Sequence, residues 1–171
     1  MGYTSYLEKY EIIRVTPTLD TSAYSNNDVF FNATEIPNAV RESGGCSRLL
    51  DITILNEDNV DCAVDLVFMQ VSKDLGTIND VVGSNSKWTN ALAKAAKVLG
   101  VVKIDMTDSF TNLVNNIVYT YNNFGTGSGG MAPFLLQAES DSTSVYVAAV
   151  IRDGTPTCAA DDWELVFHIE K

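Results

Sequence analysis

The stretch Trp163-Glu164-Leu165-Val166-Phe167-His168-Ile169 places a large apolar side chain at every second position. Successive side chains of a β-strand point to opposite faces, so this period of two predicts a strand with one buried face. The predicted inward face consists of Trp163, Leu165, Phe167 and Ile169. The run Leu50-Asp51-Ile52-Thr53-Ile54 shows the same alternation. Two such runs make a β framework the first expectation for this chain.

Shorter apolar runs bounded by turn residues continue this pattern. They lie at residues 10–15, 29–31, 60–71, 101–106, 117–121, 134–138 and 145–151. The run 60–71 is largely apolar on both faces, which is expected of a strand covered on both sides. The alternation of strands and helices that indicates a parallel sheet is missing from the sequence. The fold is therefore predicted to be mainly all-β: an antiparallel β-sandwich, for which the jelly roll is one candidate form.

One segment follows a helical repeat of 3.6 residues instead. Its apolar side chains fall on one side of a helix, and they are Trp88, Leu92, Ala95, Ala96 and Leu99. Asn85 or Ser86 can cap its start, and Gly100 can end it. The sequence therefore predicts a single short helix near residues 87–98, lying across the open side of a sheet.

Size and charge limit the class of protein. With 171 residues, 46% of them hydrophobic, the chain is expected to form one sandwich domain over residues 9–171, preceded by a flexible polar arm at residues 1–8. The start resembles no signal peptide and no stretch suits a membrane span, so a soluble, unexported protein is expected. The 11 basic and 22 acidic residues give a net charge of −11, which repels phosphate backbones and anionic lipids. Neither nucleic acid nor a membrane is an expected partner.

Few residues in the sequence are suited to chemistry. His168 is the single histidine, so no catalytic triad can be proposed. The glycine-rich run 125–130 lacks the ending of a phosphate loop, and the acidic turns lack the spacing of a calcium loop. The odd set Cys46, Cys62 and Cys158 is expected to consist of small buried thiols in a reducing compartment. No catalytic residue, cofactor or metal site is predicted, and the chain is not expected to be an enzyme.

Five aromatic side chains are the candidates for contact with a partner. Tyr3 and Tyr6 lie in the polar arm, whereas Tyr119, Tyr121 and Phe124 follow one another closely around a predicted strand. The second group could form a platform on which sugars stack. Aromatic residues two positions apart in a strand are also ordinary cross-strand core, and both interpretations stay open.

The stretch Val15-Thr16-Pro17-Thr18-Leu19-Asp20-Thr21-Ser22-Ala23-Tyr24, continued by Asp28-Val29-Phe30-Phe31, resembles the opening of small virion structural proteins of tailed bacteriophages, of the marine and cyanobacterial type. The likeness extends through residues 34–40 and 147–157. It departs from the pattern at residues 108–130, which are longer here, and in the tyrosine-bearing arm. Its motifs are structural, so the resemblance carries over no functional residue.

The resemblance implies a non-enzymatic particle component, located in the virion and assembled in the host bacterial cytoplasm. The form it favours is a capsid decoration, or cement, protein on the outer shell. Its expected partners are the major capsid protein or other virion proteins, together with further copies of itself in a homo-oligomer. The alternative is a carbohydrate-binding or adhesive module of a phage fibre or tail, with Tyr119, Tyr121 and Phe124 as the stacking surface. A small hydrolase is disfavoured because the sequence offers no second histidine as a base.

Overall fold

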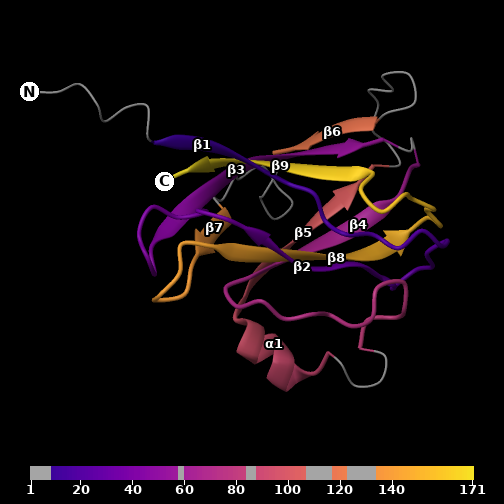
Figure 1. The fold of residues 1–171 in the computed structure, drawn as a ribbon, viewed down its shortest axis with the longest axis horizontal. Coiled ribbons are helices and arrows are strands. Elements are labelled where there is room, and N and C mark those ends of the chain that lie inside the picture. Colours follow the sequence, from indigo (N-terminus) through magenta and orange to yellow (C-terminus); the bar gives the residue numbers. More distant parts are fainter. Residues whose placement is uncertain (1–8, 58–59, 84–87, 107–116, 123–133) are drawn as a thin grey trace, which may run out of the picture.

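Two antiparallel β-sheets face each other in the computed structural model, which describes residues 9–57, 60–83, 88–106, 117–122 and 134–171 (Figure 1). The five-stranded sheet consists of β1 (Tyr10–Val15), β3 (Cys46–Asn56), β6 (Ile117–Tyr121), β7 (Phe134–Gln137) and β9 (Trp163–Glu170). The four-stranded sheet consists of β2 (Val29–Ile36), β4 (Ala63–Met69), β5 (Val98–Asp105) and β8 (Val145–Asp153). One helix, α1 (Asn90–Ala96), lies outside the four-stranded sheet. The predicted sandwich with one short helix is confirmed.

The strand pairing is nested along the chain. β4 pairs with β5, β3 with β6 and β7, β2 with β8, and β1 with β9, always antiparallel. This is the pattern of one long hairpin whose two arms run side by side. Rolling up the hairpin places alternate pairs in different sheets, which gives the orders β1-β9-β3-β6 and β2-β8-β4-β5. These are the strand orders of a jelly roll, the candidate form named from the sequence.

The main core lies between the two sheets. On β9 the four alternating side chains named from the sequence are all fully buried. Trp163 meets Phe30 of β2 edge to face, with ring centroids 4.7 Å apart, and Phe167 meets Phe68 of β4 in the same way at 6.0 Å. Such contacts between aromatic rings add to the burial of their apolar surface. They join the two sheets at the start and near the middle of β9.

The outer face of the four-stranded sheet is covered by the connection from β4 to β5. This connection, together with α1, runs beneath the sheet in Figure 1. A second apolar cluster forms there, made of Val29, Met69, Leu75, Ala96, Ala148 and Val150. This cluster covers the outer side of β4 while the main core covers the inner side. The interpretation as a strand buried on both faces is therefore confirmed for Ala63–Met69, whereas the predicted run 60–71 extends beyond the strand at both ends.

The helix is shorter than the sequence predicted. It covers Asn90–Ala96 and not residues 87–98. The Thr89 hydroxyl caps its start, and Lys97 ends it in the left-handed conformation, with φ 49°. A residue in this conformation stops the helical ladder in the way a glycine usually does. Leu99, assigned to the apolar side of the helix, belongs instead to β5 and packs against the main core.

Gly100 has a different role from the helix end predicted for it. It lies in β5 opposite Phe68 of β4. A Cβ atom at this position would lie 2.8 Å from the ring of Phe134, so glycine leaves the space that this ring occupies. The Phe134 ring in turn packs beside Phe68, with centroids 5.0 Å apart. Asn85 and Ser86, the predicted helix caps, lie outside the described residues.

Two of the three cysteines have the predicted environment. Cys62 and Cys158 are buried, and burial raises the pKa of the Cys62 thiol. Cys46 is exposed, so the expectation of a buried thiol is wrong there. The reason is the alternation of β3, in which Ser47 and Leu49 point into the sandwich and Cys46 therefore points out.

Candidate protein-binding face

The outer face of the five-stranded sheet is left open by the described elements (Figure 1). It carries the side chains that alternate with the buried ones along each strand. We call this surface the open face, and the side chains that define it are Lys9, Tyr10, Ile12, Arg14, Arg48, Asp51, Thr53, Leu135, Glu164, His168 and Glu170. The described part of the molecule is thus asymmetric, because its own chain covers the outer face of the other sheet.

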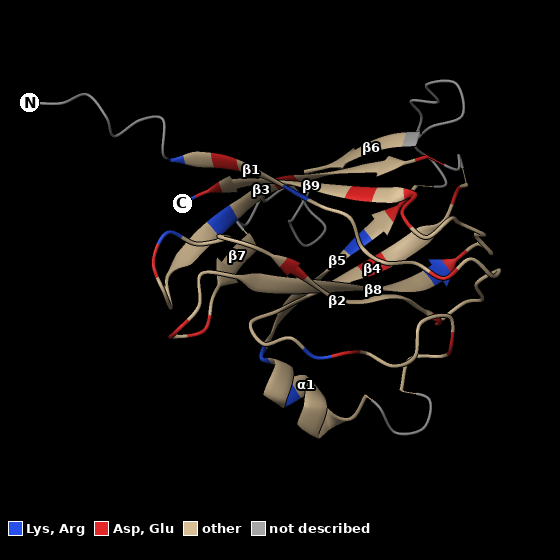
Figure 2. Cartoon of the chain, viewed as in Figure 1, with Lys and Arg blue, Asp and Glu red and all other residues tan. Residues whose placement is uncertain are grey.

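Charged side chains on the open face are paired with one another. Glu170 lies between Lys9 and Arg48, whose Nη1 is 3.0 Å from the Glu170 Oε2. Arg14 Nη1 lies 2.7 Å from Glu164 Oε2. The hydrogen bond from Lys9 and the charge of Arg48 lower the pKa of Glu170, and Glu170 raises the pKa of Lys9. β9 carries only acidic segments in Figure 2, whereas β1 and β3 also carry basic ones. The three basic and three acidic side chains that define the open face leave it nearly neutral in a chain of net charge −11.

Polar pairs also connect the strands in the middle of the open face. His168 Nδ1 of β9 is bonded to the carboxylate of Asp51 on β3. The hydroxyls of Thr53 and Thr120 are 2.9 Å apart across β3 and β6. The interpretation of His168 as a solvated or core-edge side chain is confirmed, because its side chain is 32% exposed and has a partner on the neighbouring strand.

Three large apolar side chains stand out on the same face. Tyr10 is 59% exposed, Ile12 60% and Leu135 56%, the highest values among the large hydrophobic residues that the structure describes. Leu135 borders a shallow depression of about 320 Å³, whose other walls include Lys9, Arg48 and Glu170. Exposed aromatic and aliphatic side chains next to arginine are typical of the surface that a protein partner covers.

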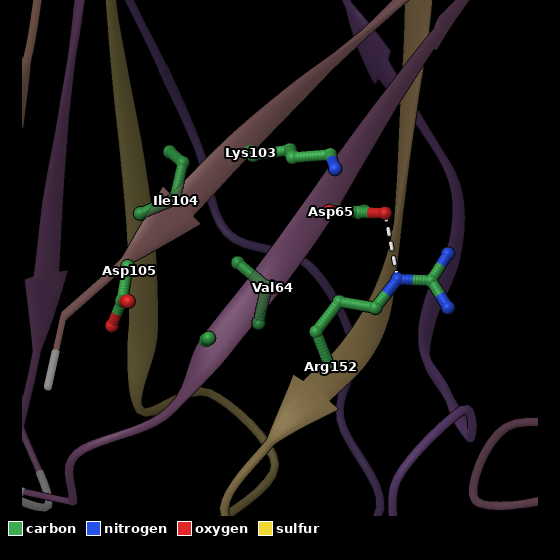
Figure 3. A pocket seen from close by; sticks show the side chains of 7 residues that line it. Val64, Asp65, Lys103, Ile104, Asp105 and Arg152 are labelled. Atoms are coloured by element: carbon green, nitrogen blue, oxygen red, sulfur yellow. Dashed lines mark hydrogen bonds and ion pairs between the residues drawn. The ribbon is translucent and has the colours of Figure 1, made fainter.

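A second depression, of about 440 Å³, lies on the four-stranded sheet (Figure 3). It is lined by charged side chains that include Asp65, Lys103, Asp105 and Arg152. The guanidinium of Arg152 is held by protein on both sides: Nε donates to Asp65 at 2.6 Å and Nη1 donates to Asn27 at 2.9 Å. This pairing compensates the burial of the Asp65 carboxylate. We therefore assign the arrangement a structural role.

Neither depression has the ligands of a metal centre. Among the described residues, no group of three or more histidine, cysteine, aspartate or glutamate side chains could hold a metal ion. None of the helical residues described forms a segment long and apolar enough to cross a membrane.

Tyr119 and Tyr121 lie on β6, where the predicted strand was placed. The register sets them opposite Ile54 and Ile52, which are fully buried, so both rings point toward the interior. They pack against the main core, and burial raises the pKa of each phenol. The cross-strand core interpretation is therefore the one that their packing supports. Other predicted sites lie outside the described residues: Tyr3, Tyr6, Phe124 and the glycine-rich run 125–130.

The exposed apolar residues of the open face were not singled out from the sequence. A signal for two of them was present in residues 10–15, where Tyr10 and Ile12 lie on one face of the strand and Ile13 and Val15 on the other. Such a strand is either covered on both faces or exposes apolar surface. The alternation does not distinguish the two cases, because that depends on which sheet face another segment covers.

Comparison with known proteins adds little to the structure itself. No protein-family model matches the chain, and no curated protein matches it. Among solved structures, one from Desmodium yellow mottle tymovirus is similar, with 12% sequence identity and a TM-score of 0.28 over 94% of this chain and 79% of the other. Values this low bear on neither fold nor function, so the jelly roll is established by the strand order alone.

Proposed function

We propose that this chain is a non-enzymatic structural protein of a bacteriophage particle, specifically a capsid decoration protein that binds the outer shell and stabilises it. Its partners are the major capsid protein or another virion protein, and further copies of itself. The open face is the surface that makes the contact.

The observation that carries this proposal is the asymmetry of the two outer faces. The four-stranded sheet is covered by the connection that contains α1 and has a second apolar cluster of its own. The open face has no such cover among the described residues and holds Tyr10, Ile12 and Leu135 exposed. Burying these side chains against a partner is favourable by about 25 cal/mol for each Å² of apolar surface removed from water. A sandwich whose described elements cover one outer face and leave the other open is suited to binding a surface.

The stretches that resemble phage virion proteins support the same class. They form the corner before β2 and part of the core: Tyr24, Phe30 and Phe31 are all buried. The Tyr24 hydroxyl donates to the carbonyl of Phe30 at 3.1 Å and accepts from the N–H of Asp20. The buried positions within these stretches bear on the type of sandwich, and exposed residues select the partner.

Binding to a shell would stabilise it through linkage. A ligand that binds only the assembled state shifts the equilibrium toward assembly, and the shift grows with the number of occupied sites. The near-neutral open face allows close contact, while the acidic remainder of the surface keeps the free protein soluble. The acidic surface also favours approach to basic protein surfaces over approach to nucleic acid.

The test is to mix the purified protein with particles assembled without it. We expect co-sedimentation at a fixed ratio to the capsid subunit and a higher temperature of particle disruption. Leu135→Glu should weaken co-sedimentation because it places a charge in the depression of the open face. Deletion of residues 1–8, the arm with Tyr3 and Tyr6, tests whether the arm adds to the contact.

Val101→Glu is the matched control, since Val101 is also an exposed strand residue, 48% accessible, but lies on β5 of the other sheet. It should leave co-sedimentation unchanged. Equal loss with both variants would contradict the assignment of the contact to the open face. Saturable binding to a glycan, with none to the shell, would establish the adhesive alternative instead.

A further inference from the structure

β1 is an edge strand. Within the described part of the chain it pairs with β9 on one side only, and it forms the end of the five-stranded sheet. An edge strand presents backbone N–H and C=O groups that another strand can pair with. Whether it does so depends on which residues direct those groups outward and on what their side chains meet.

The hydrogen-bond pattern with β9 identifies the outward groups. Lys171 donates its backbone N–H to the carbonyl of Lys9 at 2.8 Å. In an antiparallel ladder, residue pairs that exchange such bonds alternate with pairs that do not. Every second residue from Lys9 onward therefore bonds to β9, in the unbroken register of this pair. The residues between them direct N–H and C=O toward the free edge, and these are Tyr10, Ile12 and Arg14.

These three residues of one copy are complementary to the same three residues of a second copy. A second β1 lying antiparallel, with Ile12 opposite Ile12 of the second copy, brings Tyr10 opposite Arg14 and Arg14 opposite Tyr10. All three residues on each strand then exchange bonds, about six backbone hydrogen bonds in all. Sliding by two residues in either direction leaves only about four within the strand. One register is thus favoured by the backbone alone.

The side chains favour the same register. Tyr10, Ile12 and Arg14 all lie on the open face, so in the paired state each phenol ring is beside the guanidinium of the other copy. Arginine over an aromatic ring and two facing isoleucines are both favourable cross-strand pairs. No like charges come opposite each other, because Glu11 faces Ile13 of the second copy and is paired with Lys171 of its own chain.

We infer that two copies of this chain form a dimer through β1, antiparallel and with Ile12 on the two-fold axis. The five-stranded sheets of the two copies join into one continuous sheet, with both open faces on the same side. The partner at the free edge of β1 is a second copy of β1 rather than an unrelated strand, because β1 itself supplies both residues of each favourable pair. The strand is also neutral, with Glu11 balancing Arg14, in a chain of net charge −11.

This dimer is the homo-oligomer named in the proposed function. It rests on that function in one respect only, which is that a particle component is present in many copies. The two can fail separately. A monomer that co-sediments with shells would overturn the dimer alone, whereas a dimer that does not bind shells would overturn the decoration role alone.

The test is sedimentation velocity of the full-length chain over a wide concentration range. We expect a reversible monomer–dimer equilibrium. Ile12→Lys sets two ammonium groups opposite each other on the axis and should raise the dissociation constant at least about tenfold. Its thermal midpoint at low concentration should match that of the unaltered monomer, because the Ile12 side chain is exposed.

Leu135→Lys is the matched control: it adds the same charge to the same face at a similarly exposed position, but on β7, away from the β1 edge. It should leave the dimer intact. In a Cys46→Ser background, Ile12→Cys should give a cross-linked dimer with a thiol oxidant such as diamide, because facing residues of a bonded antiparallel pair have Cα atoms about 5.5 Å apart, within disulfide range. A chain that stays monomeric, or a dimer that Ile12→Lys leaves unchanged, would overturn the inference.

Discussion

At the scale of a single residue, the ionisation of Tyr24 makes the stability of the fold depend on pH. This side chain is buried in the main core, and burial raises the pKa of Tyr24 to about 12. An unfolded tyrosine ionises near pH 10, so between pH 10 and about 12 the unfolded state releases a proton that the folded state keeps. The contribution of Tyr24 to stability is therefore constant well below pH 10 and falls as pH rises through this window. The loss in the free energy of unfolding is about 2–3 kcal/mol for this one group.

Denaturant melts of the unaltered chain and of Tyr24→Phe, measured at several pH values from 8 to about 12, check this expectation. The variant loses the two hydrogen bonds of the hydroxyl and should be less stable at pH 8 by about 1–2 kcal/mol. Above pH 10 its stability should decline less steeply, with a residual slope from the Cys62 thiol, whose pKa burial also raises. Parallel curves for the two proteins would show that Tyr24 does not titrate in this range.

At the scale of elements, Gly100 allows β5 to pack closely against the Phe134 ring of β7. Gly100→Ala should destabilise the fold by about 1–2 kcal/mol, because the new methyl group would lie 2.8 Å from the Phe134 ring and force it to move. The cost should shrink when Phe134 is first replaced by Leu, a smaller side chain. A double-mutant cycle of urea melts measures this coupling. Equal costs in both backgrounds would place the strain elsewhere in β5.

The elements themselves were largely predictable, because each strand carries its own local signal. β1 and β6 have the predicted bounds, and the inward face of β9 is the one that the alternation of Trp163, Leu165, Phe167 and Ile169 indicated. The end of the helix was not predictable from residue type. Gly100 is the residue that usually ends a helix, yet Lys97 does so three residues earlier, since the pairing of β5 with β4 already includes Val98.

The candidate site was far less predictable than the strands. The predicted contacts Tyr119 and Tyr121 face inward, and the exposed set of Tyr10, Ile12 and Leu135 was missed. Local alternation divides a strand into two faces but does not say which face another segment will cover. That follows from the order of strands and from the path of the β4–β5 connection, which covers one sheet and leaves the other open.

The charge distribution of the whole molecule sets how it responds to salt. Two effects oppose each other. Screening weakens the ion pairs of the open face, such as Arg14 with Glu164, but exposed pairs contribute only about 0–1 kcal/mol each. Screening also weakens repulsion among the excess acidic residues, which the net charge of −11 makes the larger effect. Raising sodium chloride from about 0.02 M to about 0.5 M, where the screening length falls well below the molecular diameter, should therefore raise the thermal midpoint by a few degrees.

A charge-reduced variant tests the cause of that rise. Asp74, Asp141 and Asp161 are exposed, and replacing all three with asparagine changes the net charge from −11 to −8. This variant should melt higher than the unaltered chain at low salt and gain less from added salt. The neutral double variant Arg14→Gln/Glu164→Gln removes an ion pair at constant net charge, so it should keep the full gain. A midpoint that falls with salt in the unaltered chain would mean that the ion pairs of the open face, and not the acidic excess, dominate the electrostatics of the fold.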